Sequence, residues 1–150
     1  MAEFVVTGFL DPVPPNRFSR DAWPRHITVS TNFEFDDGGS DLAASLAGAL
    51  EGVGPVEASA GAAAGFGPGG SIPVVLVEPP EPWRDLHERM RAVIARGGGR
   101  FTTPHGGDAY RPHVTDTRAG AWIGTATVTR LHLVRLDGRT AAVDAAFRLA

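Results

Sequence analysis

Clusters of glycine and proline divide this chain of 150 residues into short periodic segments, and this division limits what it can fold into. The sequence holds 19 glycines and 12 prolines, and they gather between the periodic segments instead of diluting them. Glycine and proline end helices and strands and supply tight turns. The chain is therefore expected to fold as several short elements joined by tight connections.

Two segments have the periodicity of an amphipathic helix. The first carries an apolar row of Leu42, Leu46 and Leu50, with Ser40 as the expected N-cap and Gly52 where the helix should stop. In the second, Pro82 suits the first turn and the three glycines at 97–99 end the helix. Its apolar stripe consists of Trp83, Leu86, Met90 and Ile94.

Strand patterns fill most of the remaining sequence. Residues 26–35 alternate strictly, with Ile27 and Val29 on one face and His26 and Thr28 on the other. The other expected strands are 3–9, one within 55–64, 72–77, 111–117, 125–136 and 141–149. Asp137-Gly138 is a hairpin-turn pair. Two helices among about seven strands predict an α+β architecture.

Composition excludes several classes of protein. Cysteine is absent, so no disulfide framework or thiolate metal site can form, and a cytoplasmic location is expected. No run of about 18 apolar residues occurs, so no membrane-spanning segment is expected. All 14 basic residues are Arg and the net charge is -3, which argues against a broad basic surface for long nucleic acid. A small or terminal phosphate ligand remains possible.

One short pattern occurs twice, once in each half of the chain. Residues 26–29 (HITV) and 113–116 (HVTD) both place a histidine two positions before a threonine, with an apolar residue between them. In a strand, residues i and i+2 point to the same face, so each copy presents an imidazole beside a hydroxyl while the apolar residue faces the core. If the two strands lie next to each other, four polar groups converge on one cleft.

These groups fit phosphoester cleavage without a metal. One neutral imidazole can take a proton from an attacking hydroxyl or water, and the other, protonated, can supply a proton to the departing oxygen. Histidine suits both roles because its ordinary pKa of about 6.5 allows either state near neutral pH. The Thr28 and Thr115 hydroxyls can donate hydrogen bonds to non-bridging phosphate oxygens. The pattern leaves open which of His26 and His113 is the acid.

The sequence resembles the 2H phosphoesterase superfamily, specifically its 2′-5′ RNA ligase and cyclic phosphodiesterase branch, at these two motifs. Members carry two His-x-Thr/Ser-x motifs, one per half of a duplicated α+β fold. The similarity extends to the turn at 65–67, the helix from Trp83, the Arg111-Pro112 lead-in and the terminal strands. It implies one domain over 1–150 with two pseudo-symmetric lobes, two antiparallel sheets flanking a central cleft and about two main helices.

The resemblance also implies an enzyme: a phosphodiesterase that opens 2′,3′-cyclic phosphates or cleaves 2′-5′ bonds of nucleotides or RNA ends, with reversal as a ligase left open. It assigns acid/base catalysis to His26 and His113 and phosphate binding to Thr28 and Thr115. Arg118 matches a basic residue that often follows the second motif. No metal or other cofactor is expected. The expected partner is a small nucleotide or RNA end, not a long duplex or a membrane, and the protein is expected to act as a monomer.

Two features depart from the family pattern. The position after the second threonine is usually apolar in the family, but here it is Asp116, so either that face is locally exposed or the strand ends early. The motifs also have few cations around them, whereas an RNA-processing member should offer several. This favours a short or mononucleotide-like substrate, or an activity lost by drift.

Two alternatives to this enzyme remain open. The first is a noncatalytic phosphate- or nucleotide-binding module that keeps the two-histidine cleft. The second is a metal site formed by His26, His113 and His105, which is disfavoured because no carboxylate follows them at a suitable spacing.

The other conspicuous residues are interpreted mainly as structural. Residues 65–70 match GxGxxG but precede a strand and so form a turn, and His87-Glu88 lacks the second histidine of a zinc-binding HExxH motif. Tyr110 is expected in a polar loop, where a base could stack on it. His132 alternates with leucines and is expected on a solvated strand face. Pro73 should place the 72–77 strand at a sheet edge or shift its start.

Overall fold

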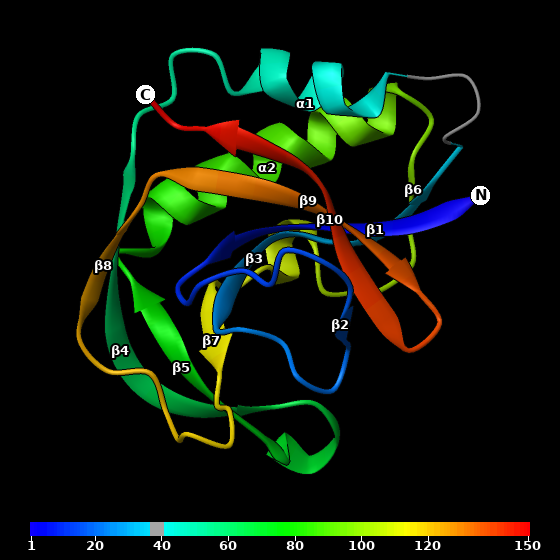
Figure 1. Ribbon diagram of the computed structural model, residues 1–150. Helices are drawn as coiled ribbons and strands as arrows, with labels where there is room; N and C mark the ends of the chain where they lie inside the picture. The colour runs from blue at the N-terminus through cyan, green and yellow to red at the C-terminus, as the bar shows by residue number, and fades with distance from the viewer. Residues whose placement is uncertain (37–40) are drawn as a thin grey trace.

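The computed structural model describes residues 1–36 and 41–150, and its strands and helices form two sheets and a pair of helices (Figure 1). Their order is β1 (Ala2–Phe9), β2 (Phe18–Ser19), β3 (His26–Phe35), α1 (Leu42–Ala49), β4 (Val56–Phe66), the 3-10 turn η1 (Pro68–Gly70), β5 (Ile72–Glu78), α2 (Pro80–Arg96), β6 (Arg100–Phe101), the 3-10 turn η2 (Gly107–Ala109), β7 (His113–Thr115), β8 (Thr125–Val128), β9 (Arg130–Asp137) and β10 (Thr140–Arg148).

Both sheets are antiparallel. One has six strands in the order β2-β10-β9-β1-β3-β6, and the other has four in the order β7-β5-β4-β8. Figure 1 shows α1 and α2 lying together at the top of the view, with the four-stranded sheet descending from them and β7 reaching the side of β3. The predicted bilobal α+β fold is confirmed.

The six-stranded sheet has two differently covered faces. Phe4, Val6, Ile27 and Val29 point to one face, where they join the stripe of α2 in the main core. Trp83, Met90 and Ile94 of that stripe are fully buried, as the helical periodicity predicts. On the opposite face, Val5 and Phe9 pack with Phe18 and Trp23 in a smaller core. The segment from 11 to 25 therefore folds over the second face and leaves part of it open.

The helix ends agree with the sequence patterns in most respects. Leu42 and Leu46 of α1 are buried, and the side chain of Asp41 caps the helix by accepting a 3.3 Å hydrogen bond from the Ala44 amide. Ser40, the expected N-cap, lies outside the described residues. Helix α2 begins at Pro80, two residues before Pro82, because a proline also suits the first helical position.

One predicted strand is in fact two. Residues 125–136 contain β8, which pairs with β4, and β9, which pairs with β1 and β10, so the chain passes from one sheet to the other at Thr129. Strand-like composition identifies extended chain but does not say which sheet it joins. The two-residue strands β2 and β6 lie where no strand was expected, since neither is long enough to show a period.

The expectation for Pro73 is wrong. Strand β5 begins at Ile72 and lies inside the four-stranded sheet, not at its edge. The proline is accommodated because it is the second residue of β5, and β7 pairs with β5 only from Val74 onward.

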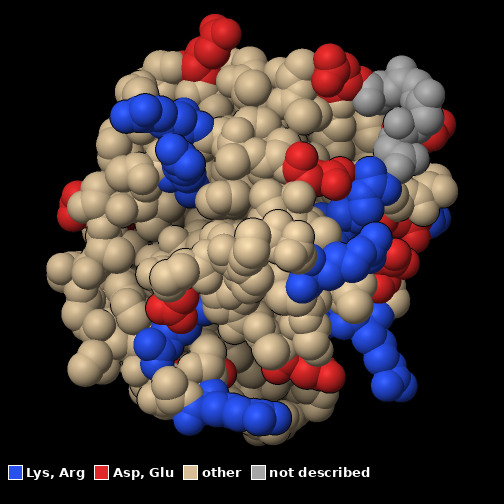
Figure 2. Space-filling view, viewed as in Figure 1, with Lys and Arg blue, Asp and Glu red and all other residues tan. Residues whose placement is uncertain are grey.

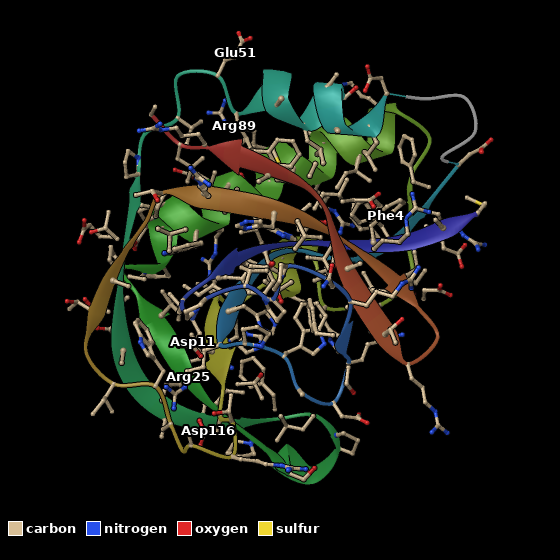
Figure 3. The ribbon with its side chains drawn as sticks, viewed as in Figure 1. Phe4, Asp11, Arg25, Glu51, Arg89 and Asp116 are labelled. Atoms are coloured by element: carbon tan, nitrogen blue, oxygen red, sulfur yellow. The ribbon has the colours of Figure 1, made fainter. Side chains whose placement is uncertain are left out.

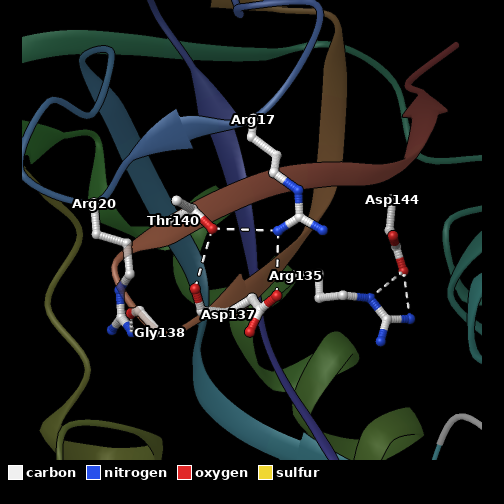
Figure 4. A network of polar contacts seen from close by, with 7 residues as sticks. All are labelled: Arg17, Arg20, Arg135, Asp137, Gly138, Thr140 and Asp144. Atoms are coloured by element: carbon white, nitrogen blue, oxygen red, sulfur yellow. Dashed lines mark hydrogen bonds and ion pairs between the residues drawn. The ribbon is translucent and has the colours of Figure 1, made fainter.

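A hairpin at the predicted Asp137-Gly138 turn joins β9 to β10. Its turn binds residues 11–25, the segment that covers part of the second face of the six-stranded sheet. Arg17 Nη1 donates to Asp137 Oδ2 at 3.2 Å and to Thr140 Oγ1 at 3.3 Å (Figure 4). Arg20 Nη1 donates to the Gly138 carbonyl at 2.8 Å, and β2 pairs with β10 beside it. These contacts fix one wall of the site described next.

Candidate functional site

A cleft of about 880 Å³ lies between two walls at the open face of the six-stranded sheet. Residues 19–25 form one wall, and residues 115–119, at and just beyond the end of β7, form the other. Val5, Asn32 and Leu136 contribute to the floor. The two walls meet where Arg25 Nη2 donates to the Gly120 carbonyl at 3.3 Å. Arg25 and Asp116, which both line the cleft, are labelled in Figure 3.

His26 is the first residue of β3 and stands at this cleft. Ile27 and Val29 are fully buried in the main core, so strand alternation directs His26 and Thr28 to the cleft, and both line it. His26 Nδ1 lies 2.8 Å from the Pro24 carbonyl oxygen. A carbonyl oxygen only accepts, so Nδ1 carries the proton and, in the neutral ring, Nε2 is left as an acceptor.

His113, the first residue of β7, repeats this arrangement in the second sheet. Its Nδ1 donates to the carbonyl of Arg111 at 2.8 Å, again two residues earlier in the chain. Val114 is buried, so His113 shares the opposite strand face with Thr115, which lines the cleft. The His113 ring is not among the groups that line the cleft itself. It is half-buried beside that lining, with its centroid 4.4 Å from that of Phe66.

Strands β3 and β7 lie side by side without pairing through their backbones (Figure 1). The side chain of Tyr110, just before β7, crosses this boundary and its hydroxyl donates to the Thr28 carbonyl at 2.8 Å. The structure thus brings His26, Thr28, Thr115 and Arg118 to one cleft and sets His113 at its margin.

Burial lowers the pKa of both histidines. For His26, desolvation lowers the pKa most, the hydrogen bond to Pro24 opposes it, and the charge of His113 lowers the pKa further. For His113, desolvation again dominates, the Arg111 carbonyl opposes it, and the charges of Arg111 and His105 add to the lowering. Because a proton on His113 disfavours one on His26, the pair resists double protonation.

Arg118 lies on the exposed tip of the second wall. Strand β7 ends at Thr115, and the next residues turn back through reciprocal backbone hydrogen bonds between Thr117 and Gly120. Asp116 therefore does not occupy a core position: its amide donates to the Pro73 carbonyl at 3.0 Å and its side chain lines the cleft. The early end of the strand accounts for an acidic residue where the family is usually apolar.

Charges in the cleft are mixed. Arg20, Arg25 and Arg118 line it together with Asp21 and Asp116. Figure 2 likewise shows basic and acidic side chains interspersed across one face of the molecule. Such a site suits a ligand with one or a few phosphates better than a long polyanion.

Two aromatic side chains beside the histidines were not singled out by the motifs. The Trp23 ring lies 4.7 Å from that of His26, and Phe66 is similarly placed at His113. Trp23 lies in an irregular segment whose sequence has no period, so only its distance of three residues from His26 could have drawn attention to it.

Four other expectations need revision or comment. Tyr110 is not available for stacking on a base, because it is buried and its ring is stacked on His87 at 4.0 Å. His132 is half-buried instead of solvated, with its ring 5.2 Å from Phe9. In ranges 1–36 and 41–150, no three His, Cys, Asp or Glu side chains gather closely enough to hold a metal ion. Nor does either range contain a helix long and apolar enough to cross a bilayer.

The fold and the cleft define a class: two-lobed α+β proteins in which two His-x-Thr strands approach one another from different sheets. A family model described as the 2′-5′ RNA ligase superfamily matches residues 14–132. The chain belongs to this superfamily, that of the 2H phosphoesterases. A search of curated proteins finds none that matches the sequence.

Solved structures with the same fold span nearly the whole chain. One described as a phosphoesterase superposes with a TM-score of 0.68 at 17% identity, covering 100% of this chain and 99% of its own. E. coli LigT complexed with 3′-AMP gives 0.64 at 17% identity, and LigT complexed with NADP+ gives 0.61 at 15% identity. Each LigT comparison covers 99% of this chain and 98% of LigT. At these identities the likeness establishes the fold.

Proposed function

We propose that this protein is a phosphodiesterase that uses His26 and His113 as its acid/base pair to hydrolyse 2′,3′-cyclic phosphates or 2′-5′ phosphodiester bonds of small nucleotides or RNA ends. One observation carries the proposal. In two different sheets, a histidine donates Nδ1–H to the carbonyl two residues before it and shares its strand face with a threonine. This repeated geometry leaves both Nε2 atoms free to exchange protons with a ligand.

The reaction follows from this geometry in general terms. A phosphate ester binds at the cleft, and the neutral imidazole removes a proton from a water molecule as its oxygen attacks phosphorus. The bond from phosphorus to the ester oxygen breaks, and the second imidazole, protonated at Nε2, gives its proton to that oxygen. Two protons are transferred: the first ring gains one and the second ring loses one, so the total charge of the two rings is unchanged. Thr28 and Thr115 donate to the non-bridging oxygens, and Arg118 compensates their charge.

The lowered pKa values are compatible with this cycle. A bound phosphate anion favours the charged form of a nearby imidazole and so raises its pKa. Since the charge of one ring disfavours a proton on the other, a pair whose pKa values are raised by bound phosphate takes up one extra proton before it takes up two. The singly protonated pair is the state that acid/base catalysis requires.

A small substrate fits the mixed charge of the cleft. LigT, which shares the fold, has been crystallised with 3′-AMP, NADP+, phosphate and ATP. All four carry phosphate, and three are nucleotides. We infer that this chain, as a single domain over 1–150, binds ligands of the same kind.

The test is a hydrolysis assay with 2′,3′-cyclic nucleotides and 2′-5′ dinucleotides. His26→Ala and His113→Ala should each lower kcat by about 10² to 10⁴, the usual contribution of a positioned acid or base. His132→Gln is the matched control. His132 lies opposite Thr7, which lies opposite Thr28, so it is on the sheet face that carries the cleft but does not line the cleft. Nucleotide binding without turnover by the parent protein would contradict the proposal and support the noncatalytic module.

A further inference from the structure

His87 is a fully buried polar side chain that the proposed reaction does not use. It lies on α2, and its ring is stacked parallel to that of Tyr110, with centroids 4.0 Å apart and 2° between the planes. Its Nδ1 lies 2.7 Å from the Val29 carbonyl oxygen, and its Nε2 accepts a hydrogen bond from the Gly107 amide at 2.8 Å. The ring is therefore neutral, with the proton on Nδ1.

Both hydrogen bonds end on backbone that leads directly to the site. Where β1 pairs with β3, Val6 lies opposite Ser30 and the next residue, Thr7, lies opposite Thr28. Val29 therefore has no partner in β1 and forms a bulge in β3. His87 donates a hydrogen bond to the Val29 carbonyl in this bulge, and the Tyr110 hydroxyl donates to the Thr28 carbonyl at 2.8 Å. The two side chains thus hold the strand at the residue whose hydroxyl faces the cleft.

On its Nε2 side, His87 binds the Gly107 amide, which lies in the segment before the second motif. Gly107 adopts a φ of +64°, and a Cβ at Gly106 would come within 3.4 Å of His87 Cε1 and 3.2 Å of Thr31 Oγ1. Glycine suits the positive φ at 107, and the missing side chain at 106 leaves room for the end of Arg91 and for the Thr31 hydroxyl. Three residues beyond Gly107 comes Tyr110, and the next carbonyl, that of Arg111, holds the His113 ring.

We infer that His87 and Tyr110 are positioning residues, which join the bulge beside Thr28 to the segment that carries His113 and so set the separation of the two motifs. The inference rests on the proposed function, because it concerns the geometry of the same site. Neither residue touches the substrate. Their effect passes through backbone groups that belong to the two catalytic strands.

Protonation of His87 should release this connection. A proton on Nε2 would point at the Gly107 N–H. Two donors would then face each other, and the hydrogen bond from the Gly107 amide to Nε2 would be lost. The charged groups that act on His87 are Arg91, Glu88 and Arg84 of its own helix, and the neighbour from the other side is Tyr110. Desolvation is the main cause of its lowered pKa, so the neutral ring and its two bonds persist at neutral pH.

The experiment compares three variants of the full chain. His87→Phe keeps the ring on Tyr110 but removes both hydrogen bonds, while His87→Gln keeps an acceptor near the position of Nε2 and cannot titrate. Ile94→Ala is the control, since Ile94 is fully buried on the same helix and its apolar side chain makes no hydrogen bond to the carbonyls of Thr28 and Val29. Readouts are kcat and KM for a 2′,3′-cyclic nucleotide, amide exchange at Gly107, and the NMR signals of the His26 and His113 rings.

His87→Phe should lower kcat by about 10 to 100-fold, the scale of a small misplacement of reacting groups, with a smaller change in KM. It should also abolish Gly107 protection and shift the His113 ring signal. His87→Gln should retain Gly107 protection at every pH at which the chain stays folded, whereas the parent should lose it once the pH falls below the lowered pKa of His87. Ile94→Ala should lower Tm yet leave kcat within about twofold, since cavities destabilise without reaching the site.

Parental kcat and parental ring signals in folded His87→Phe would overturn the inference. So would Gly107 protection in the parent that matches the glutamine variant over the whole pH range in which the chain is folded. If the parent protein turns over no substrate, the proposed function fails but the ring signals and Gly107 exchange still decide whether His87 positions the motifs.

Discussion

Replacing Gly65 by alanine should couple a steric clash in a surface turn to the environment of His113. A Cβ at Gly65 would lie closer than 3.0 Å to the Gly70 carbonyl oxygen, with Gly70 C at 3.1 Å and Cα at 3.2 Å. Ordinary contact begins at 3.4 Å, so the backbone of the turn must retreat by at least about 0.4 Å. Backbone cannot give way as the end of a flexible side chain can.

The expected cost follows from that displacement. Overpacking of this kind typically costs about 1 to 3 kcal/mol. In a chain of this size, 1 kcal/mol shifts Tm by about 2 to 4 °C, so Gly65→Ala should lower Tm by about 2 to 12 °C. The adjacent Phe66 should move with the turn, and its ring lies 4.4 Å from His113 and 5.2 Å from the Arg111 guanidinium carbon. The His113 ring signal should therefore shift.

Calorimetry and NMR on the parent and two variants would test this reasoning. Gly48→Ala is the matched control, because a Cβ there meets nothing within 4 Å and the position lies in α1. Alanine is favoured over glycine in a helix by up to about 1 kcal/mol, so this variant should raise Tm. A Gly65→Ala protein with parental Tm and a parental His113 signal would refute the steric account.

Three further predictions follow from the charges and contacts. The lowered pKa values of His26, His87, His113 and His132 mean that the folded chain binds fewer protons than the unfolded one below pH ~6.5, so stability should be complete above that pH and fall as pH drops, which Tm measured from pH 8 to 5 would reveal. Turnover of cyclic nucleotides should be unchanged by EDTA; loss of activity that added Zn²⁺ restores would contradict the two-histidine proposal. Arg17→Ala should change stability by less than about 1 kcal/mol in urea unfolding, because its ion pair with Asp137 is exposed; a larger loss would show that the network of Figure 4 does more than hold one wall.

The repeated motif and the helix patterns could be predicted from the sequence because each depends on local geometry. Alternation in β3 requires only that Ile27 and Val29 find a core, and the apolar stripe of α2 requires the same. The motif spacing therefore indicated correctly which side of its strand each histidine would occupy.

Other features depend on contacts that no local pattern records. Whether β8 and β9 continue in one sheet or part at Thr129 is decided by which strands they pair with. The burial of Tyr110 depends on His87 and Thr28, which lie far away in the sequence. The bulge at Val29 likewise arises from the register with β1 and leaves no mark on the alternation.

The passage of the chain between sheets has a consequence for how the protein is made. Strand β1 lies between β3 and β9, so the sheet that carries His26 cannot close until a segment near the carboxyl end has been synthesised. Pairings over such long stretches of sequence form slowly, because a large loop must be ordered before any contact compensates for it. A nascent chain that stopped after β8 would therefore leave β1 with an open edge, although β3 and β7, the two histidine strands, could already pair with β1 and β5.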